Sequence, residues 1–418
     1  MRISIEQSEI NGEIRVPPSK SYTIRGLMCA ALAKGESSLI NPLSADDTLA
    51  AADVLKTVGI RIRENTSGWK VSGGNFAQPQ SSLNCRESAA TLRFMTAISS
   101  LVPGESHLIM GSSLAKRPIE PLIKALRAWG AKIEWNSLSG ITVKGGNLAG
   151  GITEIPGDIS SQFVSALLLV APLTEKQSII RVTSPLESRS YVMMTLECLN
   201  NFGIQIETND VLNEFQIDSQ TYQPSNYEVE GDWSSASYLI ALGAAGGKMR
   251  LSGLNLSSLQ SDRIMLDLVK EMGAWILVED NYFTVITGRL QAIKADLNEC
   301  IDLLPTLAVL ASLAEGTSEF TGIRRARFKE SDRVLAISAN LQNAGIKVKV
   351  EDDRIYITGG RISPTVINPY GDHRIAMAFS IIGVARGGIL IDQAECVSKT
   401  YPDFWSVLKN SGVIMHEQ

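Results

Sequence analysis

A short motif recurs six times along the chain and constrains the fold more than any other feature. In each copy an amphipathic, helix-like stretch ends at a glycine, and residues of alternating polarity follow. Successive copies lie about 70 residues apart. Glycine is typical of a helix C-terminus, so each copy predicts a helix end followed by a strand. The copies read LKTVGIRI, LRAWGAKI, LNNFGIQI, VKEMGAWI, LQNAGIKV and LKNSGVIM, with glycines at Gly59, Gly130, Gly203, Gly273, Gly345 and Gly412.

Each repeat also contains a second helix-like stretch that is apolar or small on nearly every side. Such helices are expected to be buried. A unit of about 70 residues cannot easily bury one alone, so we expect three units to group as one domain and six to make two. The stretches read YTIRGLMCAALA, ATLRFMTAISSL, SQFVSALLLVAPL, SASYLIALGAAG, PTLAVLASLAEG and RIAMAFSIIGVA.

Polar clusters stand just before or at the start of these apolar helices. They read PSKS, CRES, ISSQ, DWSS, IDLLP and YGDHR. Helix N-termini present unpaired backbone N–H groups and the positive end of the helix dipole, which suit anions. If the two domains face each other through these ends, the clusters would lie in one cleft.

Composition and charge exclude several classes of protein. Hydrophobic residues make up 44% and charged residues 20% of the 418 positions, as in a globular protein. A net charge of −5 argues against a general nucleic-acid or membrane-surface binder. The five cysteines are scattered without a CxxC and the three histidines without an HExxH, so no disulfide framework or metal site is indicated.

The N-terminus does not resemble a signal peptide. The stretch MRISIEQSEINGEIRV predicts a pair of strands around a turn at Asn11-Gly12. No apolar run reaches the roughly 18 to 20 residues needed to cross a bilayer. We therefore expect a cytoplasmic protein.

The stretch RARFKESDRVLA, from Arg325 to Ala336, allows two interpretations. Charge runs usually lie on solvated faces, and Ser331 or Asp332 is a candidate helix cap. The same cations and carboxylates also suit a charged substrate, and the local sequence alone favours the solvated face.

Eight separated motifs resemble, in order and over the whole chain, those of the 5-enolpyruvylshikimate-3-phosphate synthase family. The resemblance implies an α/β fold of two inside-out α/β barrels with three repeats in each domain. It implies one domain at residues 19–230 and a second at 1–18 plus 231–418. The motifs are PPSKSYTIR, AKRPIEPL, DISSQF, SRSYVMMTL, DWSSASY, FKESDR, YGDHRIAMAF and SKTYPDF.

Enzymes of this family transfer the enolpyruvyl group of phosphoenolpyruvate to the 5-hydroxyl of shikimate 3-phosphate and release phosphate. The resemblance implies the same reaction here, in the shikimate pathway to aromatic amino acids. It also implies a monomer that uses no metal and no organic cofactor. Both substrates carry phosphate and carboxylate, so a cluster of arginines and lysines is needed.

Matched motif by motif, the resemblance assigns a role to individual residues. Glu330 would protonate the methylene carbon, Asp302 would receive the hydroxyl proton, and His373 would support Glu330 or phosphate departure. Lys20 is counted with these catalytic residues. The residues expected to bind phosphoenolpyruvate are Lys20, Ala89, Arg117, Gln162, Arg333, Arg374 and Lys399. Those expected to bind shikimate 3-phosphate are Ser21, Arg25, Ser160, Ser161, Gln162, Ser188, Tyr191, Asp302 and Lys329.

One loop departs from the family pattern. In ESAATLR, which ends at Arg93, Glu87 stands at the usual Asn, Ala89 at the usual Gly and Ala90 at the usual Thr. The β-carbon of Ala89 would intrude where the phosphate of phosphoenolpyruvate sits, and Glu87 would repel an anion. The inhibitor glyphosate is longer than phosphoenolpyruvate, so reduced glyphosate sensitivity is expected. Arg325 stands where some members have Asn, as an added or replacement cation.

Two other functions remain as alternatives. The sister family transfers enolpyruvate to UDP-N-acetylglucosamine, but it starts with a Lys-Asn pair and usually has a cysteine in the loop before its Arg-Pro motif. This chain has Lys20-Ser21 and GSSLAKRP instead. A non-catalytic module that binds anions or RNA is disfavoured by the acidic charge and the missing aromatic-basic surface pattern.

Overall fold

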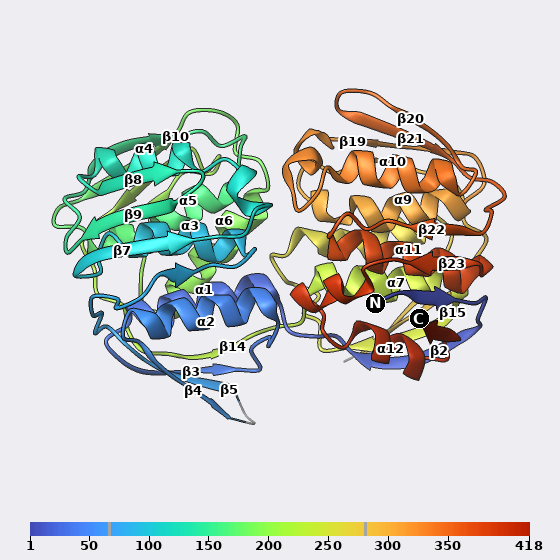
Figure 1. Cartoon of the computed structure of the whole chain (residues 1–418), viewed down its shortest axis with the longest axis horizontal. Helices are drawn as coiled ribbons and strands as arrows, with labels where there is room; N and C mark the ends of the chain where they lie inside the picture. Colours follow the sequence, from blue (N-terminus) through green and yellow to red (C-terminus); the bar gives the residue numbers. More distant parts are fainter. Residues whose placement is uncertain (66–67, 280–281) are drawn as a thin grey trace. The chain divides into compact units, whose positions relative to one another are not determined.

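The computed structural model of the chain describes residues 1–65, 68–279 and 282–418 (Figure 1). These residues form two compact units, one of Pro18–Glu230 and one of Met1–Pro17 with Gly231–Gln418. Each unit holds three four-stranded sheets among its described residues. In every sheet one parallel pair is followed by two antiparallel pairs, so the sixfold repeat of the sequence is a repeat of sheet topology.

The strand order is the same in all six sheets. In Pro18–Glu230 the sheets run β14 (Asn226–Glu228), β3 (Gly35–Ile40), β5 (Gly68–Gly73), β4 (Arg61–Asn65); β6 (Leu83–Asn84), β7 (Gly104–Ile109), β9 (Gly140–Gly145), β8 (Lys132–Asn136); and β10 (Gly151–Ile155), β11 (Ser178–Val182), β13 (Glu214–Ile217), β12 (Glu207–Thr208). In the other unit they run β2 (Ile10–Arg15), β15 (Gly247–Ser252), β17 (Tyr282–Ile286), β16 (Trp275–Glu279); β18 (Lys294–Asp296), β19 (Thr317–Thr321), β21 (Arg354–Thr358), β20 (Lys347–Val350); and β22 (Thr365–Ile367), β23 (Ile389–Ile391), β1 (Ile3–Ile5), β24 (Met415–Glu417).

The apolar stretches are buried helices, as the sequence predicts. Nearly every residue of these helices is inaccessible to solvent, and α7, α9 and α11 contact one another in the middle of their unit (Figure 1). In the other unit α3 contacts both α1 and α5. The helices are α1 (Lys20–Leu32), α3 (Ala89–Ile98), α5 (Ser161–Val170), α7 (Trp233–Gly246), α9 (Leu304–Leu313) and α11 (His373–Arg386).

The six repeated glycines end the amphipathic helices. All six have positive φ, from +80° at Gly203 to +102° at Gly273, which favours glycine. The residue after each glycine donates its N–H to a carbonyl five residues back, as Ile60 does to Leu55 at 3.0 Å. This is the Schellman arrangement, so the predicted C-caps are confirmed. The helices are α2 (Asp46–Thr57), α4 (Glu120–Ala128), α6 (Arg189–Asn201), α8 (Met265–Glu271), α10 (Arg333–Asn343) and α12 (Phe404–Asn410).

The predicted turn at Asn11-Gly12 is wrong. Both residues lie inside β2, opposite Lys248 and Met249 of β15, while β1 pairs with β23 and β24 in another sheet. The two N-terminal strands are therefore not partners and complete two separate sheets. A β-carbon on Gly12 would lie 2.5 Å from the sulfur of Met249 and 2.8 Å from Ser411 Oγ, so these two side chains would have to shift.

A close approach of backbone to backbone recurs where a strand ends against a buried helix. A β-carbon on Gly73, Gly145 or Gly359 would lie 2.1, 2.2 or 1.7 Å from a carbonyl oxygen at the end of α1, α3 or α9. These distances are far below van der Waals contact, and backbone atoms cannot move aside as a side chain can. Glycine therefore sets the spacing between helix and sheet in three of the repeats.

We expect Gly359→Ala to lower the free energy of unfolding by about 1–3 kcal/mol, because the new methyl group overpacks the helix end. The neighbouring Gly360→Ala is the matched control, since its β-carbon would meet only Ile346 Cδ1 at 3.8 Å. Thermal and urea unfolding of both variants measures the difference. Equal stability of the two variants would contradict the packing argument.

Candidate active site

Arg333, the first residue of α10, lies at the centre of a buried charge cluster. Its side chain is 1% exposed and donates to Asp302 Oδ1 at 2.7 Å, Glu330 Oε2 at 2.6 Å and Asp372 Oδ2 at 2.8 Å. Burial alone would lower the pKa of Arg333, but these three negative charges raise it. The structure thus brings three residues predicted for the site, Asp302, Glu330 and Arg333, into direct contact.

Asp302 is shared by three cations. It lies in the 3-10 turn Ile301–Leu303 that leads into α9. Besides Arg333, Lys329 Nζ lies 3.2 Å from its Oδ1 and Arg374 Nη2 lies 3.1 Å from its Oδ2. Burial alone would raise the pKa of Asp302, but Arg374, Lys329 and Arg333 hold it well below its usual range. Asp302 is therefore a carboxylate, not a carboxylic acid, in this structure.

The start of α11 supplies the other side of the cluster. Asp372 is fully buried and caps the helix, because its Oδ1 accepts from the backbone N–H of Arg374 at 3.0 Å. His373 is 1% exposed, with Nδ1 3.8 Å from Asp372 Oδ1. Lys399 Nζ lies 3.7 Å from Glu330 Oε1. One helix N-terminus therefore positions a cap, a histidine and an arginine together.

The charged stretch from Arg325 to Ala336 contains both a helix cap and side chains that turn into the buried charge cluster. Of the two candidate caps, Ser331 and Asp332, it is Asp332 that caps α10, since it accepts from the N–H of Leu335 at 2.9 Å. Lys329 and Glu330, in contrast, turn into the buried cluster. Arg325 donates to the carbonyl of Asn298, so it braces the loop before Asp302. This contact gives Arg325 a structural role, while its role as an added cation stays a prediction from the sequence.

In Pro18–Glu230, Arg25 joins α1 to α6. Its buried guanidinium donates to Thr195 Oγ1 at 2.8 Å and to the carbonyls of Ser21 and Tyr191 at 3.1 Å each. The ring of Tyr191 also packs against the guanidinium, with its centroid 5.7 Å from Cζ. Ser188, the residue before α6, is buried with φ of +52°. Four residues predicted to bind shikimate 3-phosphate thus lie on adjoining helix ends.

Arg93 on α3 is a residue that the sequence-based prediction did not place in the site. It donates to Ser160 Oγ at 3.0 Å and to Gln162 Oε1 at 2.7 Å, and it also reaches the carbonyl of Pro118 at 3.4 Å. Ser160 is the N-cap of α5 and Ser161 its first residue. Arg93 therefore connects the predicted Ser160–Gln162 segment with the residue next to Arg117. The sequence did contain a signal for Arg93, because an arginine within an otherwise apolar, buried helix needs polar partners.

In the altered loop, Glu87 makes hydrogen bonds to the backbone of the segment before Arg117. The carboxylate of Glu87 accepts from the backbone N–H of Leu114 at 2.9 Å and of Ser113 at 3.3 Å, at the start of the 3-10 helix before Arg117. Glu87 thus anchors the segment that carries Arg117, which the repulsion argument from sequence had missed. Ala89 is the first residue of α3 and is half-buried.

Lys20 starts α1 and pairs with Asp47. Its Nζ lies 3.2 Å from Asp47 Oδ2, and Asp47 belongs to the first turn of α2. The preceding Asp46 instead pairs with Arg86 at 2.8 Å. The acidic pair Asp46-Asp47 therefore divides its contacts between a predicted site lysine and the altered loop.

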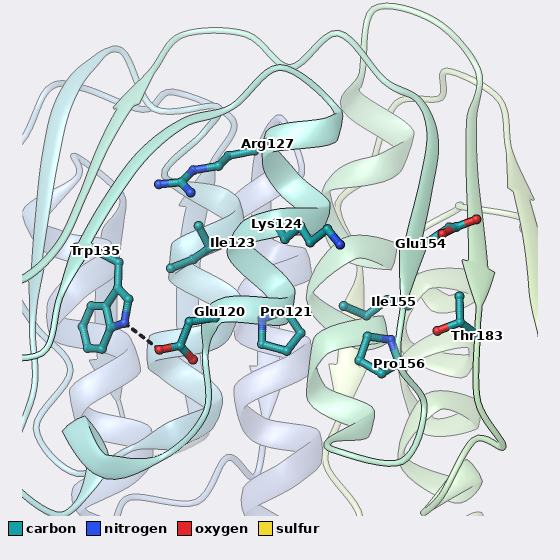
Figure 2. Close-up of a pocket in the computed structure, with 10 residues that line it drawn as sticks. All are labelled: Glu120, Pro121, Ile123, Lys124, Arg127, Trp135, Glu154, Ile155, Pro156 and Thr183. Carbon is teal, nitrogen blue, oxygen red and sulfur yellow. Dashed lines mark hydrogen bonds between the residues drawn. The ribbon is translucent and has the colours of Figure 1, made fainter.

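A cavity of about 630 Å³ lies elsewhere, beside α4 (Figure 2). Figure 2 shows Trp135 hydrogen-bonded to Glu120 on one side and Glu154 with Thr183 on the other. No residue predicted for the site lines this cavity. It is therefore separate from the residues described above.

Comparison with known proteins decides the family. Residues 5–408 match the model of EPSP synthase (3-phosphoshikimate 1-carboxyvinyltransferase). The chain belongs to the EPSP synthase family. It is 47% identical over 414 residues to a 3-phosphoshikimate 1-carboxyvinyltransferase of Dehalococcoides mccartyi, covering 99% of this chain and 98% of that protein. A protein of the same name from Methanothermobacter thermautotrophicus is 41% identical, with 97% of each chain covered.

The fold agrees with this family. A solved EPSP synthase from Acinetobacter baumannii superposes with a TM-score of 0.84 and 26% identity, and the match covers 100% of both chains. The predicted α/β fold with its six repeats is confirmed. Among the described residues, no helix is long and apolar enough to cross a membrane. Within the same ranges, no group of three or more histidine, cysteine or acidic residues is placed to hold a metal ion.

We expect Arg333→Met to lower the free energy of unfolding by about 3–5 kcal/mol at pH 7.5, because it leaves buried carboxylates without their shared cation. In the native protein the depressed pKa of Asp302 stabilises the fold at every pH above its unfolded pKa of 3.8, so this contribution is the same at pH 7.5 and pH 5. In the variant the uncompensated carboxylates destabilise the fold at high pH and are neutralised at low pH. The stability difference should therefore shrink between pH 7.5 and pH 5.

Thermal unfolding at both pH values measures this difference. Arg327→Met is the matched control, since Arg327 makes long, partly exposed contacts, 3.6 Å to Asp332 and 3.5 Å to the carbonyl of Glu351, and their loss should cost under about 1 kcal/mol. A difference for Arg333→Met that does not change with pH would point to lost packing instead of lost charge pairing.

Proposed function

We propose that this chain is a 3-phosphoshikimate 1-carboxyvinyltransferase. It transfers the enolpyruvyl group of phosphoenolpyruvate to the 5-hydroxyl of shikimate 3-phosphate and releases phosphate, as a monomer in the cytoplasm. The observation that carries the proposal is the 47% identity to a protein of this name over almost the full length of both chains. The contact of Asp302, Arg333 and Glu330 supports it, because the reaction needs two carboxylates and a cation.

The proposed reaction is an addition followed by an elimination. The 5-hydroxyl bonds to C2 of phosphoenolpyruvate, its proton passes to Asp302, and Glu330 donates a proton to C3. The bond from C2 to the phosphate oxygen then breaks, and Glu330 takes a proton back from C3, which restores the double bond. The proton held by Asp302 leaves with the departing phosphate, so both carboxyl groups return to their starting states. Two carboxylates in different electrostatic settings can divide these transfers.

The cations are proposed to bind the two anionic substrates. Phosphoenolpyruvate would be held next to Ala89 by five cations and one amide, which are Lys20, Arg117, Arg333, Arg374, Lys399 and Gln162. Shikimate 3-phosphate would be held by hydroxyl, amide and charged side chains, which are those of Ser21, Arg25, Ser160, Ser161, Gln162, Ser188, Tyr191, Asp302 and Lys329. His373 would support Glu330 from its place beside Asp372. Arg93 joins this set as a support of Ser160 and Gln162.

Phosphate release from phosphoenolpyruvate tests the proposal. We expect release only when shikimate 3-phosphate is present, and a kcat lowered about a hundred- to ten-thousandfold in Glu330→Gln, where a proton donor is lost. Lys20→Met should also lose release, through weaker binding of the anion. The exposed Glu351→Gln and Lys347→Met are matched controls and should retain full activity.

Other outcomes separate the alternatives. Release with UDP-N-acetylglucosamine but not with shikimate 3-phosphate would identify the sister reaction. Binding of the phosphosugar without any turnover would favour a non-catalytic module. No release with either acceptor would mean that the altered Glu87–Ala90 segment has cost the chain this activity.

We expect weak inhibition by glyphosate, because the β-carbon of Ala89 narrows the space beside the phosphate. Ala89→Gly should lower the glyphosate concentration for half inhibition by about tenfold or more, the effect typical of one methyl group in a closed pocket. Ala90→Gly, one position later, serves as the control. Tight inhibition of the unaltered protein, with no gain on Ala89→Gly, would overturn the assignment of Ala89.

A further inference from the structure

Three consecutive polar side chains, Gln260, Ser261 and Asp262, lie between the start of α7 and the loop before Asp302. The Gln260 side chain accepts from the N–H of Trp233 at 3.1 Å and donates to the carbonyl of Gly231 at 2.8 Å. Ser261 donates to the carbonyl of Glu299 at 2.7 Å. Asp262 follows and lies in a short 3-10 helix. The segment therefore connects the start of α7 with the loop that precedes Asp302.

Asp262 ends a chain of hydrogen bonds that begins at Arg374. Arg374 Nη1 donates to Ser234 Oγ at 2.7 Å, and Ser234 Oγ donates to Asp262 Oδ2. Asp262 is 3% exposed, and within the described residues its other oxygen, Oδ1, is buried without a hydrogen-bond partner. Nothing in the proposed reaction uses this carboxyl group.

The direction of this chain follows from proton counting. A guanidinium only donates, so Ser234 Oγ must accept from Arg374. The single hydroxyl proton of Ser234 must then point elsewhere, and a carboxylate oxygen accepts it. If Asp262 were absent, the hydroxyl could rotate its proton toward Arg374 and lose the bond. By accepting the hydroxyl proton of Ser234, Asp262 keeps a lone pair of Ser234 Oγ directed at Arg374.

We propose that Asp262 is a positioning residue that orients the hydroxyl of Ser234 and thereby holds the guanidinium of Arg374 in place for an anionic substrate. The inference rests on the proposed function, in which Arg374 binds phosphoenolpyruvate. On its other side Arg374 contacts Asp302, which itself takes up a proton in the proposed reaction. Tyr238 Oη also accepts from Arg374 Nη1, at 3.3 Å, and like Ser234 and Asp262 it takes no part in the proposed proton transfers to and from the substrates.

The charge on Asp262 offers a second readout. Burial and the negative charge of Asp302 raise its pKa to about 6, while Arg374 and the bond from Ser234 act in the opposite direction. The negative charge of Asp232 also raises the pKa of Asp262. The thiol of Cys300 is a further titratable group close enough for its own pKa to be raised, by burial first and then by Asp262. An anion bound at Arg374 adds negative charge and favours the neutral acid. The neutral acid still accepts from Ser234, so positioning is retained while repulsion is removed.

Kinetics of four variants test the proposal. We expect Asp262→Ala and Ser234→Ala each to raise KM for phosphoenolpyruvate about five- to tenfold with kcat nearly unchanged, because a binding contact loosens. Since Asp262 acts through Ser234, the double variant should be no worse than Ser234→Ala alone. Asp262→Asn keeps an acceptor oxygen and should restore KM to within about twofold of the unaltered protein. It should also flatten the dependence of KM on pH near 6 relative to the unaltered protein.

The matched control is Asp267→Ala, an exposed aspartate on α8 that should change neither constant. Effects of Asp262→Ala and Ser234→Ala that multiply, a loss confined to kcat, or a failed rescue by Asp262→Asn would each overturn the proposal. If Asp262→Ala is not recovered folded, Ser234→Ala and Asp262→Asn carry the test through the same KM, kcat and pH readouts.

Crystal structures without substrate separate this proposal from the proposed function. In Ser234→Ala and Asp262→Ala we expect the Arg374 guanidinium to leave the place that it occupies in the unaltered protein. An unmoved Arg374 would refute the positioning role. A displaced Arg374 with unchanged KM in an active enzyme would instead refute the role of Arg374 in binding phosphoenolpyruvate.

Discussion

Burial of the six apolar helices is the constraint on which the rest of the structure depends. Because these helices are apolar nearly all round, the sheets must enclose them, and three repeats together do what one repeat cannot. At their N-terminal ends these helices present backbone N–H groups that need polar partners. Ser19, Ser160, Asp232 and Asp372 cap four of these ends, and the predicted site residues stand beside the caps. The position of the chemistry thus follows from the packing.

The sequence allowed much of this architecture to be predicted, because helix ends and apolar periodicity are local signals. The six glycines, the buried helices and the α/β repeat could all be read from it. The Asn11-Gly12 turn was wrong for a physical reason: the partners of β1 and β2 lie more than 200 residues away along the chain, so local turn chemistry was overruled by long-range pairing. The close approach at Gly359 was likewise invisible, since it depends on where α9 ends.

Site residues found from the sequence were those with charges in recognisable motifs. The structure adds residues that act through others. Asp372 is part of the GDHR motif, but the sequence did not show that its carboxylate accepts a hydrogen bond from Nε of Arg333. Glu87 suggested repulsion, yet its carboxylate is satisfied by backbone N–H groups in the loop before Arg117. Asp262 gave no signal at all, because its partner Ser234 lies in a different motif. Such supporting contacts join distant segments and cannot be inferred from spacing.

The pairing of cations with carboxylates has a consequence for the proposed chemistry. Asp302, held well below its usual pKa by Arg374, Lys329 and Arg333, is a poor proton acceptor in this structure. An anionic substrate that binds Arg333 and Arg374 shares their charge, so it weakens their hold on Asp302 and raises its pKa. Under the proposed function, Asp302 would then become a better base only when phosphoenolpyruvate is bound beside it. The same carboxylates compensate the buried cations before the substrate arrives, so the fold does not have to tolerate unpaired charge. Under the proposed function, one set of ion pairs compensates the buried charges of the free protein and would also couple binding of the anion to proton transfer.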